Sequence, residues 1–301
     1  MKKYRILSLF LTLILLMSFM TIGFSVYGQD IDDDSITSLK RKQKGDFHAS
    51  FNEYELLKQV NEEYQKSKKE QSSGSDSKFN NLSAEEIYMI ENYMEAYSNK
   101  IYDLKEWEIE ELQEVGYNNE QINAIKTFDG SEEKMALAAT TVDVDVGFRN
   151  LNHSTSGTTV DLIAAFNANG ISSNWFRDLF VVVWSTPLTV KSSSGCVGYV
   201  NRYGQKIYIE HTPRPNTLYG REIEFYKDSD GPGSDHYYID AGSIILGLKS
   251  NTYVYDFATY ASYGYTYLNI SPSANVSYGG SGLGISFIIG MSEAGWAYDS
   301  I

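Results

Sequence analysis

The chain has almost no cysteine and little histidine, which removes several kinds of site at once. Its only cysteine is Cys196, so an intramolecular disulfide framework is excluded, and a lone cysteine is most often a small buried apolar residue. The four histidines form no HExxH pattern or close pair, so nothing indicates zinc. A G-x-S-x-G elbow and a phosphate-binding loop are also missing. Catalytic residues therefore stay unassigned, and a non-catalytic role is favoured over an enzymatic one.

Long apolar runs are missing too, with one exception at the start of the chain. Residues 6–24 are uncharged and almost wholly apolar, and two lysines and an arginine precede them. The small residues Val26 and Gly28 follow, so the sequence predicts a secretory signal peptide over residues 1–28, cleaved before Gln29. An uncleaved membrane anchor is the alternative. We expect a secreted, extracellular bacterial protein that meets a membrane only through its signal peptide.

Positive charge is scarce. The formal net charge is −14, with −12 in residues 29–139, −5 in residues 140–301 and +3 in the predicted signal peptide. A net negative surface repels phosphate backbones, which argues against nucleic acid as a partner.

Proline and most of the glycine are missing from the first part of the chain. All five prolines and 18 of the 24 glycines follow residue 140, and turn residues at such density are typical of many short strands. Residues 29–139 are instead rich in the helix formers Glu, Lys, Leu and Ile. After the signal peptide we predict an acidic linker over residues 29–80, disordered in part and helical in part. A small helical region over 81–139 and an all-β domain over 140–301 follow it.

Capping patterns predict where the helices begin. Ser83 and Asp103 each have a glutamate three positions later, which is the capping-box pattern. Asn119 is predicted to open a last short helix, and a charged helix is expected over residues 49–70. The small residues at 136–140 then suggest an unstructured junction where proteases act, so the helical region is a candidate prosegment.

The second part of the chain shows strand patterns. Val142, Val144 and Val146 alternate with two aspartates, which indicates a half-buried strand. Further strand-like runs follow, with Gly, Asn, Ser or Pro clusters between most of them. The predicted fold is mainly β, an antiparallel β-sandwich or closed barrel preceded by the acidic α-helical N-terminal region.

Tyrosine is concentrated in residues 253–270. If Ala261 and Ser262 form the tip of a hairpin, Tyr253, Tyr255 and Phe257 face the core. The other face then displays Tyr260, Tyr263, Tyr265, Tyr267, Asp256 and Asn269. Aromatic faces beside carboxylate and amide groups suit carbohydrate, so these six residues are predicted to bind glycan or a cell-envelope polymer. Ordinary cross-strand packing is the alternative.

One acidic loop resembles a fragment of a calcium site. Asp228, Asp230 and Asp235 surround glycines between two strand-like runs, and calcium is bound by oxygen ligands spaced in this way. The pattern lacks the remaining ligands of an EF-hand loop, and a turn-rich connection is the favoured alternative. No cofactor is therefore expected, with calcium at these three residues as the one candidate.

The end of the chain leaves the function open. Residues 277–290 are glycine-rich, apolar and uncharged. They predict a terminal core strand in preference to a membrane-inserting hairpin, because one such run cannot satisfy its own backbone groups inside a bilayer. The leading hypothesis is a non-catalytic extracellular binding module for glycan or cell-envelope material. The alternatives are a secreted antagonistic protein that acts on membranes and a secreted hydrolase made as a precursor.

Overall fold

The computed structural model describes residues 51–70, 79–80, 82–185, 188–230, 235–279 and 282–300. The chain from Gly45 onward forms one compact unit, in which helices come first and strands follow. The predicted signal peptide and its cleavage site before Gln29 lie outside the described residues. Among the described helices, none has both the length and the apolar character needed to cross a membrane.

The helices occupy the first part of the described chain. They are α3 (Glu53–Glu70), α4 (Ala84–Lys105), α5 (Ile109–Glu114), α6 (Asn119–Lys126) and α7 (Glu132–Leu137). The predicted capping box at Ser83 is confirmed, because the Glu86 N–H donates to Ser83 Oγ at 3.2 Å and the Ser83 N–H donates to Glu86 Oε2 at 2.7 Å.

Two other predicted helix starts are displaced. The predicted start at Asp103 is wrong, because α4 runs through it to Lys105, and the capping box that opens α5 begins at Glu108. The cap of α6 is Asn118 instead of Asn119, and its side chain accepts the N–H groups of the first turn. Capping patterns thus identified the helical region, and tertiary packing set its boundaries.

The strands form two main sheets and a separate hairpin. They are β1 (Thr141–Ser154), β2 (Gly157–Asn169), β3 (Arg177–Trp184), β4 (Thr189–Val200), β5 (Lys206–His211), β6 (Arg214–Thr217), β7 (Gly220–Tyr226), β8 (Asp228–Asp230), β9 (His236–Ser250), β10 (Ala258–Thr266), β11 (Ala274–Gly279), β12 (Gly282–Phe287) and β13 (Met291–Ser300). The first sheet has the order β1-β2-β9-β4-β5, with β8 also on β9, and the second has the order β13-β10-β3-β7-β6. Strands β11 and β12 pair with each other in a two-stranded sheet.

Antiparallel pairing throughout confirms the predicted mainly β fold with helices before it. Aromatic rings fill the space between the two main sheets. The ring of Phe166 on β2 lies 5.0 Å from Phe180 on β3, 5.2 Å from Phe225 on β7 and 4.8 Å from Tyr263 on β10. The described strands form two separate main sheets that do not close into one, so of the two predicted architectures the sandwich is the one observed.

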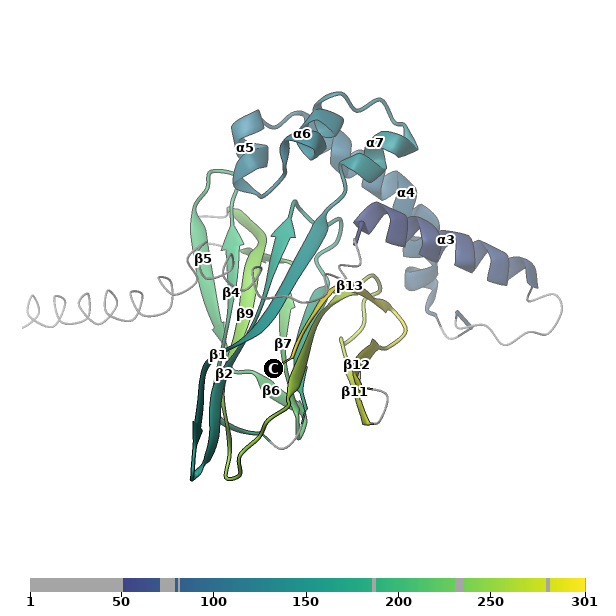
Figure 1. Ribbon diagram of the computed structural model, residues 1–301. Helices are drawn as coiled ribbons and strands as arrows, with labels where there is room; N and C mark the ends of the chain where they lie inside the picture. The colour runs from purple at the N-terminus through teal and green to yellow at the C-terminus, as the bar shows by residue number, and fades with distance from the viewer. Residues whose placement is uncertain are drawn as a thin grey trace, which may run out of the picture. The chain divides into compact units, whose positions relative to one another are not determined.

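The helices cover one end of the sandwich (Figure 1). Gln121 on α6 donates to the Asn169 carbonyl at the end of β2 at 3.3 Å, and the ring of Trp107 lies 6.1 Å from that of Tyr238 near the start of β9. We call this the helical end. The β1–β2 turn and residues 251–257, which follow β9, lie at the opposite end, called the loop end.

The predicted tyrosine hairpin is wrong. Strand β10 runs unbroken from Ala258 to Thr266, straight through the predicted tip at Ala261 and Ser262. Its two edges pair with β3 and β13, so it is an interior strand of the second sheet. Local alternation suggested a turn between two small residues, but pairing with partners far away in the sequence keeps the strand extended.

The predicted unstructured junction before residue 140 is also wrong. Ala138, Ala139 and Thr140 are buried, and only a short connection separates α7 from β1. The Glu53 N–H at the start of α3 donates to the Thr140 carbonyl at 3.2 Å. The helices therefore pack as part of the same unit, and their removal as a prosegment stays a prediction.

Candidate functional site

The β11–β12 hairpin is strongly amphipathic. Its register pairs Ala274 with Phe287, Val276 with Ile285, and Ser277 with Gly284. Because side chains alternate across a strand, one face carries Ala274, Val276, Leu283, Ile285 and Phe287, and the other carries Asn275, Ser277, Gly284 and Ser286. No charged residue occurs anywhere from 257 to 292.

The apolar face of the hairpin lies on the outside of the second sheet. Leu179, Val181 and Val183 of β3 point outward from the sandwich, yet each is 0% exposed because the hairpin covers it. These residues and the hairpin form a second hydrophobic cluster, distinct from the main core. Removing the hairpin would expose two complementary apolar surfaces, one on each partner.

The hairpin is attached to the sandwich mainly by this apolar contact. Its strands belong to neither main sheet. A described polar contact with the sandwich runs from Asn216 Nδ2 to the Ala274 carbonyl at 3.1 Å. Burial of apolar surface is non-directional, so this contact can be exchanged for another apolar environment without breaking a strand ladder of either main sheet.

The segment that carries the hairpin closes on itself at the helical end. The Tyr267 N–H donates to the Gly290 carbonyl at 2.9 Å, and Thr266 pairs with Met291 across β10 and β13. We call residues 265–267 together with Gly290 the root of the hairpin. The root is surrounded by buried polar groups.

A buried carboxylate from the first helix reaches the root. Glu53, the first residue of α3, is 0% exposed and forms an ion pair with Lys100 at 3.4 Å. It accepts hydrogen bonds from the Tyr265 hydroxyl, from Ser172 Oγ at 2.8 Å and from the Ser173 N–H at 2.7 Å. This single carboxylate connects α3, α4, the β2–β3 connection and β10.

A second buried ion pair, formed by Asp178 and Lys227 of the sandwich, binds the backbone of Thr266, the residue next to Tyr265. Lys227 Nζ lies 3.1 Å from Asp178 Oδ1 and donates to the Thr266 carbonyl at 2.7 Å. Asp178 also accepts the Thr266 N–H at 2.7 Å and the Tyr263 hydroxyl at 2.6 Å. Lys227 Nζ lies 3.7 Å from the centre of the Tyr265 ring. Both backbone polar groups of Thr266 are therefore bound by charged side chains.

The two buried acids respond differently to their surroundings. Burial raises the pKa of the Glu53 carboxyl, but Lys100 and the donated hydrogen bonds outweigh burial, so this pKa lies below its ordinary value. For Asp178, burial outweighs Lys227 and the pKa is raised. Burial also lowers the pKa of Lys227. Glu53 is therefore the carboxylate whose charged form the fold stabilises.

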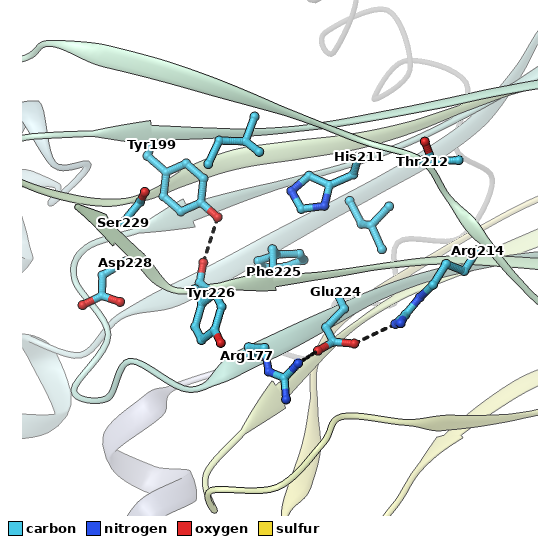
Figure 2. Close-up of a pocket in the computed structure, with 12 residues that line it drawn as sticks. Arg177, Tyr199, His211, Thr212, Arg214, Glu224, Phe225, Tyr226, Asp228 and Ser229 are labelled. Atoms are coloured by element: carbon cyan, nitrogen blue, oxygen red, sulfur yellow. Dashed lines mark hydrogen bonds and ion pairs between the residues drawn. The ribbon is translucent and has the colours of Figure 1, made fainter. Parts of the chain in front are cut away.

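A cavity of about 490 Å³ opens beside the turn from β5 to β6 (Figure 2). Among the residues that line it are Arg177, Tyr199, His211, Arg214, Glu224, Phe225, Tyr226 and Asp228. Glu224 accepts bonds from Arg177 and, at 2.7 Å, from Arg214, so one carboxylate lies between two guanidinium groups. Counting Asp228, the lining carries two formal charges of each sign.

His211 is the unusual group in this cavity. Its Nε2 atom is buried and has no hydrogen-bond partner among the described residues. Burial lowers the pKa of His211, which favours the neutral ring. The Tyr199 hydroxyl, by contrast, donates to the Tyr226 carbonyl at 3.0 Å. The cavity thus offers aromatic walls and balanced charges, and the unsatisfied ring nitrogen of His211 is buried beside it.

The six residues predicted to bind glycan do not share an exposed face. Tyr263 and Tyr265 point into the core, where their hydroxyls donate to Asp178 and Glu53. Tyr267 is buried at the helical end. The assignment to faces was inverted here, because β10 is an interior strand whose tyrosine side lies against the first sheet.

Of the other three predicted residues, Tyr260 lies on β10, and Asp256 and Asn269 lie beyond its two ends. Tyr260 lies on the outer side, where its hydroxyl donates to Glu293 Oε1 at 2.7 Å and its ring stacks on Trp296. Asp256 and Asn269 are exposed, but at opposite ends of the strand. The geometric premise of the predicted face is therefore wrong, and ligand binding by these residues stays an untested prediction.

The calcium candidates lie on a short hairpin. Strand β8 places Asp228 opposite Tyr238 and Asp230 opposite His236, and residues 231–234 between β8 and Asp235 lie outside the described residues. No group of three or more His, Cys, Asp or Glu side chains suited to a metal occurs in the described part of the chain. Calcium at Asp228, Asp230 and Asp235 stays a prediction.

Exposed aromatic rings gather at the loop end. Tyr253 stacks on His153 with ring centres 4.3 Å apart, and Tyr255 lies 4.4 Å from Tyr253. Their exposed fractions are 48% for Tyr253 and 75% for Tyr255. Sequence reasoning placed these two tyrosines in the core and so missed an aromatic cluster on the surface.

Sequence reasoning also missed the hairpin's two faces. It selected residues 277–290 for their glycine and lack of charge and treated them as one run. The period-two alternation over 274–287 was present in the sequence and identifies two strands. By contrast, nothing local marks Glu53 as a buried residue, because its partners Lys100, Ser173 and Tyr265 lie 47, 120 and 212 positions away.

Comparisons with known proteins give distant likenesses only. No protein-family model matches the chain, and no curated protein matches it. One similar solved structure, described as "Pore forming protein", shares 8% identity over 54% of this chain and 89% of that chain, with a TM-score of 0.26. Another, "Clostridium perfringens delta-toxin", shares 6% identity over 54% and 87%, with a TM-score of 0.23. Likenesses at these scores carry no argument, so function is argued from the chain's own residues.

Proposed function

We propose that this chain is a secreted membrane-active protein that inserts the β11–β12 hairpin, with its flanking residues, into a lipid bilayer. The observation that carries the proposal is the charge-free amphipathic hairpin, whose apolar face is stored against Leu179, Val181 and Val183. An apolar face of this kind can exchange one apolar environment for another at little cost in free energy.

The alternation extends beyond the paired strands. Each strand pairs over six residues, about 20 Å at 3.3 Å per residue, which is shorter than the hydrocarbon core of about 30 Å. Continuing the same alternation outward, as far as Gly290, the last residue before β13, gives residues 269–279 and 282–290. A transmembrane strand needs about 9–11 residues, so both extended strands are long enough.

The extended strands keep their two faces. The apolar face gains Ile270, Pro272 and Ile289, and the polar face gains Asn269, Ser271, Ser273 and Gly290. Ile288 departs from the polar face, and Pro272 lacks a backbone N–H. This is the pattern expected when one face contacts lipid and the other lines an aqueous lumen.

A single inserted hairpin would leave backbone groups unpaired on both outer edges. Such groups cost several kcal/mol each in hydrocarbon. The proposal therefore includes assembly of several copies, whose hairpins pair edge to edge until no free edge remains. In such an assembly the backbone N–H and C=O groups on each hairpin edge are paired by the neighbouring copy, which a single hairpin cannot achieve.

The loop end supports an orientation toward the bilayer. The exposed rings of Tyr253 and Tyr255 lie there, and tyrosine favours the membrane–water interface. The hairpin leaves β10 near the helical end and extends toward the loop end (Figure 1), and its apolar face packs on β3. Contact of the aromatic cluster with lipid headgroups would bring the hairpin close to the bilayer.

Glycan binding is the second candidate function. The observation that favours it is the cavity shown in Figure 2, which replaces the predicted tyrosine face as the candidate site. Balanced charge and aromatic walls suit an uncharged, hydroxyl-rich ligand. Weakened binding of a neutral oligosaccharide by Tyr226→Ala, but not by Tyr208→Ala on β5, would support it. Both tyrosines are exposed, and Tyr208 does not line the cavity.

Leakage of a trapped dye from phosphatidylcholine vesicles tests the membrane proposal. Val276 and Ser277 are adjacent on β11 but belong to opposite faces. We expect Val276→Lys to slow leakage roughly thirtyfold or more, because a lysine facing lipid near the bilayer centre costs about 2–4 kcal/mol.

The matched control is Ser277→Lys, whose lysine would face the lumen and should preserve leakage. Thermal melting of both variants verifies that they are folded. Absence of leakage by the wild-type protein would contradict the proposal. Equal loss of leakage in the two variants would do the same.

A further inference from the structure

We propose that the N-terminal helices restrain the β11–β12 hairpin by binding its root, and that release of the hairpin requires α3 and α4 to leave residues 265–267. This inference rests on the proposed function, because it concerns the regulation of the same hairpin. It assigns the helical region a role as a restraint built into the fold.

The first contact comes from α4. The Tyr93 hydroxyl donates to the Tyr267 carbonyl in a buried position. Tyr267 is the first residue after β10, and its N–H donates to the Gly290 carbonyl on the returning side of the segment. One residue therefore joins α4 to both ends of the segment that must move.

The second contact comes from α3. Glu53 accepts the Tyr265 hydroxyl, and the ring of Phe51 lies 5.1 Å from the ring of Tyr265. Lys100 of α4 forms the ion pair that compensates the charge of Glu53. Removing the helices would take away a carboxylate, its counter-ion and an aromatic neighbour from the root together.

Thr266, which lies between Tyr265 and Tyr267, is bound by the sandwich itself. Asp178 and Lys227 bind the N–H and the carbonyl of Thr266, and neither belongs to the helical region. If the helices left, β10 would stay anchored up to Thr266, while Tyr267 and the residues after it would lose their polar contact with α4. The junction of Thr266 with Tyr267 is thus the point about which the hairpin would swing.

The distribution of polar contacts supports this assignment. The described contacts of the paired hairpin strands with the sandwich are apolar, apart from the bond from Asn216 to the Ala274 carbonyl. The charged and buried polar contacts lie at the root instead. Hydrogen bonds to buried groups are costly to leave unmade, so the root adds a directional restraint to the apolar contact of the hairpin.

Hydrogen exchange of the full chain, followed by mass spectrometry, tests the restraint in solution without any membrane. Tyr93→Phe removes only the hydroxyl that binds Tyr267. Tyr88→Phe on the same helix alters an exposed ring and is the matched control. We expect Tyr93→Phe to speed exchange about fivefold across residues 267–290, since one net hydrogen bond is worth about 1 kcal/mol. Tyr88→Phe should change nothing there.

Vesicle leakage by the same variants separates this inference from the proposed function. Faster exchange at 267–290 together with faster leakage supports both. Faster exchange at 267–290 in a protein that never causes leakage supports the restraint and contradicts the membrane function. Unchanged exchange, or an increase spread evenly over the whole sandwich, overturns the restraint whatever the leakage shows.

Discussion

The ring of Phe287 lies directly on the bare backbone of Gly264. A Cβ atom at Gly264 would stand 2.3 Å from the nearest ring atom of Phe287, closer than any real contact allows. Gly264 is on β10 and Phe287 ends β12. A glycine in the middle of a strand usually marks such a close approach, and here it lets the hairpin lie flat on the second sheet.

Gly264→Ala should therefore weaken the packing of the hairpin against the outer face of β10 and β3, which we call the seat of the hairpin. We expect the free energy of unfolding to fall by about 1–3 kcal/mol, as overpacking does elsewhere. Hydrogen exchange over residues 274–287 should rise. At Gly284, an added Cβ meets only the Ser277 hydroxyl oxygen, the end of a small side chain that can rotate away, so Gly284→Ala serves as the control. Equal stability of the two variants in thermal melts would contradict this account of the seat.

The buried pair of Glu53 and Lys100 gives a second prediction. Glu53→Gln keeps the side-chain shape but leaves the charge of Lys100 uncompensated, which should cost about 3–5 kcal/mol of stability. Adding Lys100→Met to that variant should restore a large part of the loss, because neither position then carries an uncompensated buried charge. Urea unfolding of the wild type, both single variants and the double variant measures the coupling. Additive losses would show that the two side chains do not depend on each other.

The same carboxylate predicts a pH dependence. The pKa of Glu53 is lowered in the folded protein from an ordinary value of 4.5, so its contribution to stability is complete above pH 4.5 and is lost as the pH falls through the folded-state pKa. The stability difference between the wild type and the Glu53→Gln/Lys100→Met double variant, which has no lysine at 100 to titrate, should thus be constant from about pH 7 to 5 and shrink below about 4.5. Asp178 is present in both proteins, so its opposite shift cancels. A stability difference that grows on acidification would contradict a lowered pKa of Glu53 in the folded protein.

The general architecture follows from local patterns, but the arrangement of β10 does not. The valine alternation of β1 and the capping box at Ser83 depend on neighbours within a few positions, and both predictions are confirmed. The tyrosine hairpin failed because the same alternation fits either one long strand or two short ones. Pairing with β3 and β13, which lie far away in the sequence, decided between them.

The candidate site was likewise predictable from the sequence only in part. The lack of charge over residues 257–292 and the alternation within it are visible in the sequence. The seat formed by β3 is not, because Leu179, Val181 and Val183 belong to an unbroken apolar run whose two sides look alike. Buried partners such as Glu53 and Tyr265 are joined only by the fold.

The aromatic cluster at the loop end predicts how the protein reaches a bilayer. Replacing Tyr253 and Tyr255 together by alanine should weaken co-sedimentation with phosphatidylcholine vesicles by about tenfold, equivalent to about 1.4 kcal/mol, because both rings are exposed at that end. The matched control replaces Tyr203 and Tyr208, which are also exposed but lie on other parts of the sandwich. If the control weakens binding as much, general loss of aromatic surface and not the loop end is responsible.

The central claim is that the two faces of the hairpin enter two different environments. A polarity-sensitive dye can be attached to single cysteines at Ile285 and Ser286, in a background in which Cys196, the only native cysteine, is serine. On addition of vesicles, the dye at 285 should shift to the emission of a hydrocarbon environment and be quenched by lipid-bound quenchers. The dye at 286 should keep the emission of an aqueous one. Identical responses at the two positions, or no change at either, would contradict insertion of the hairpin.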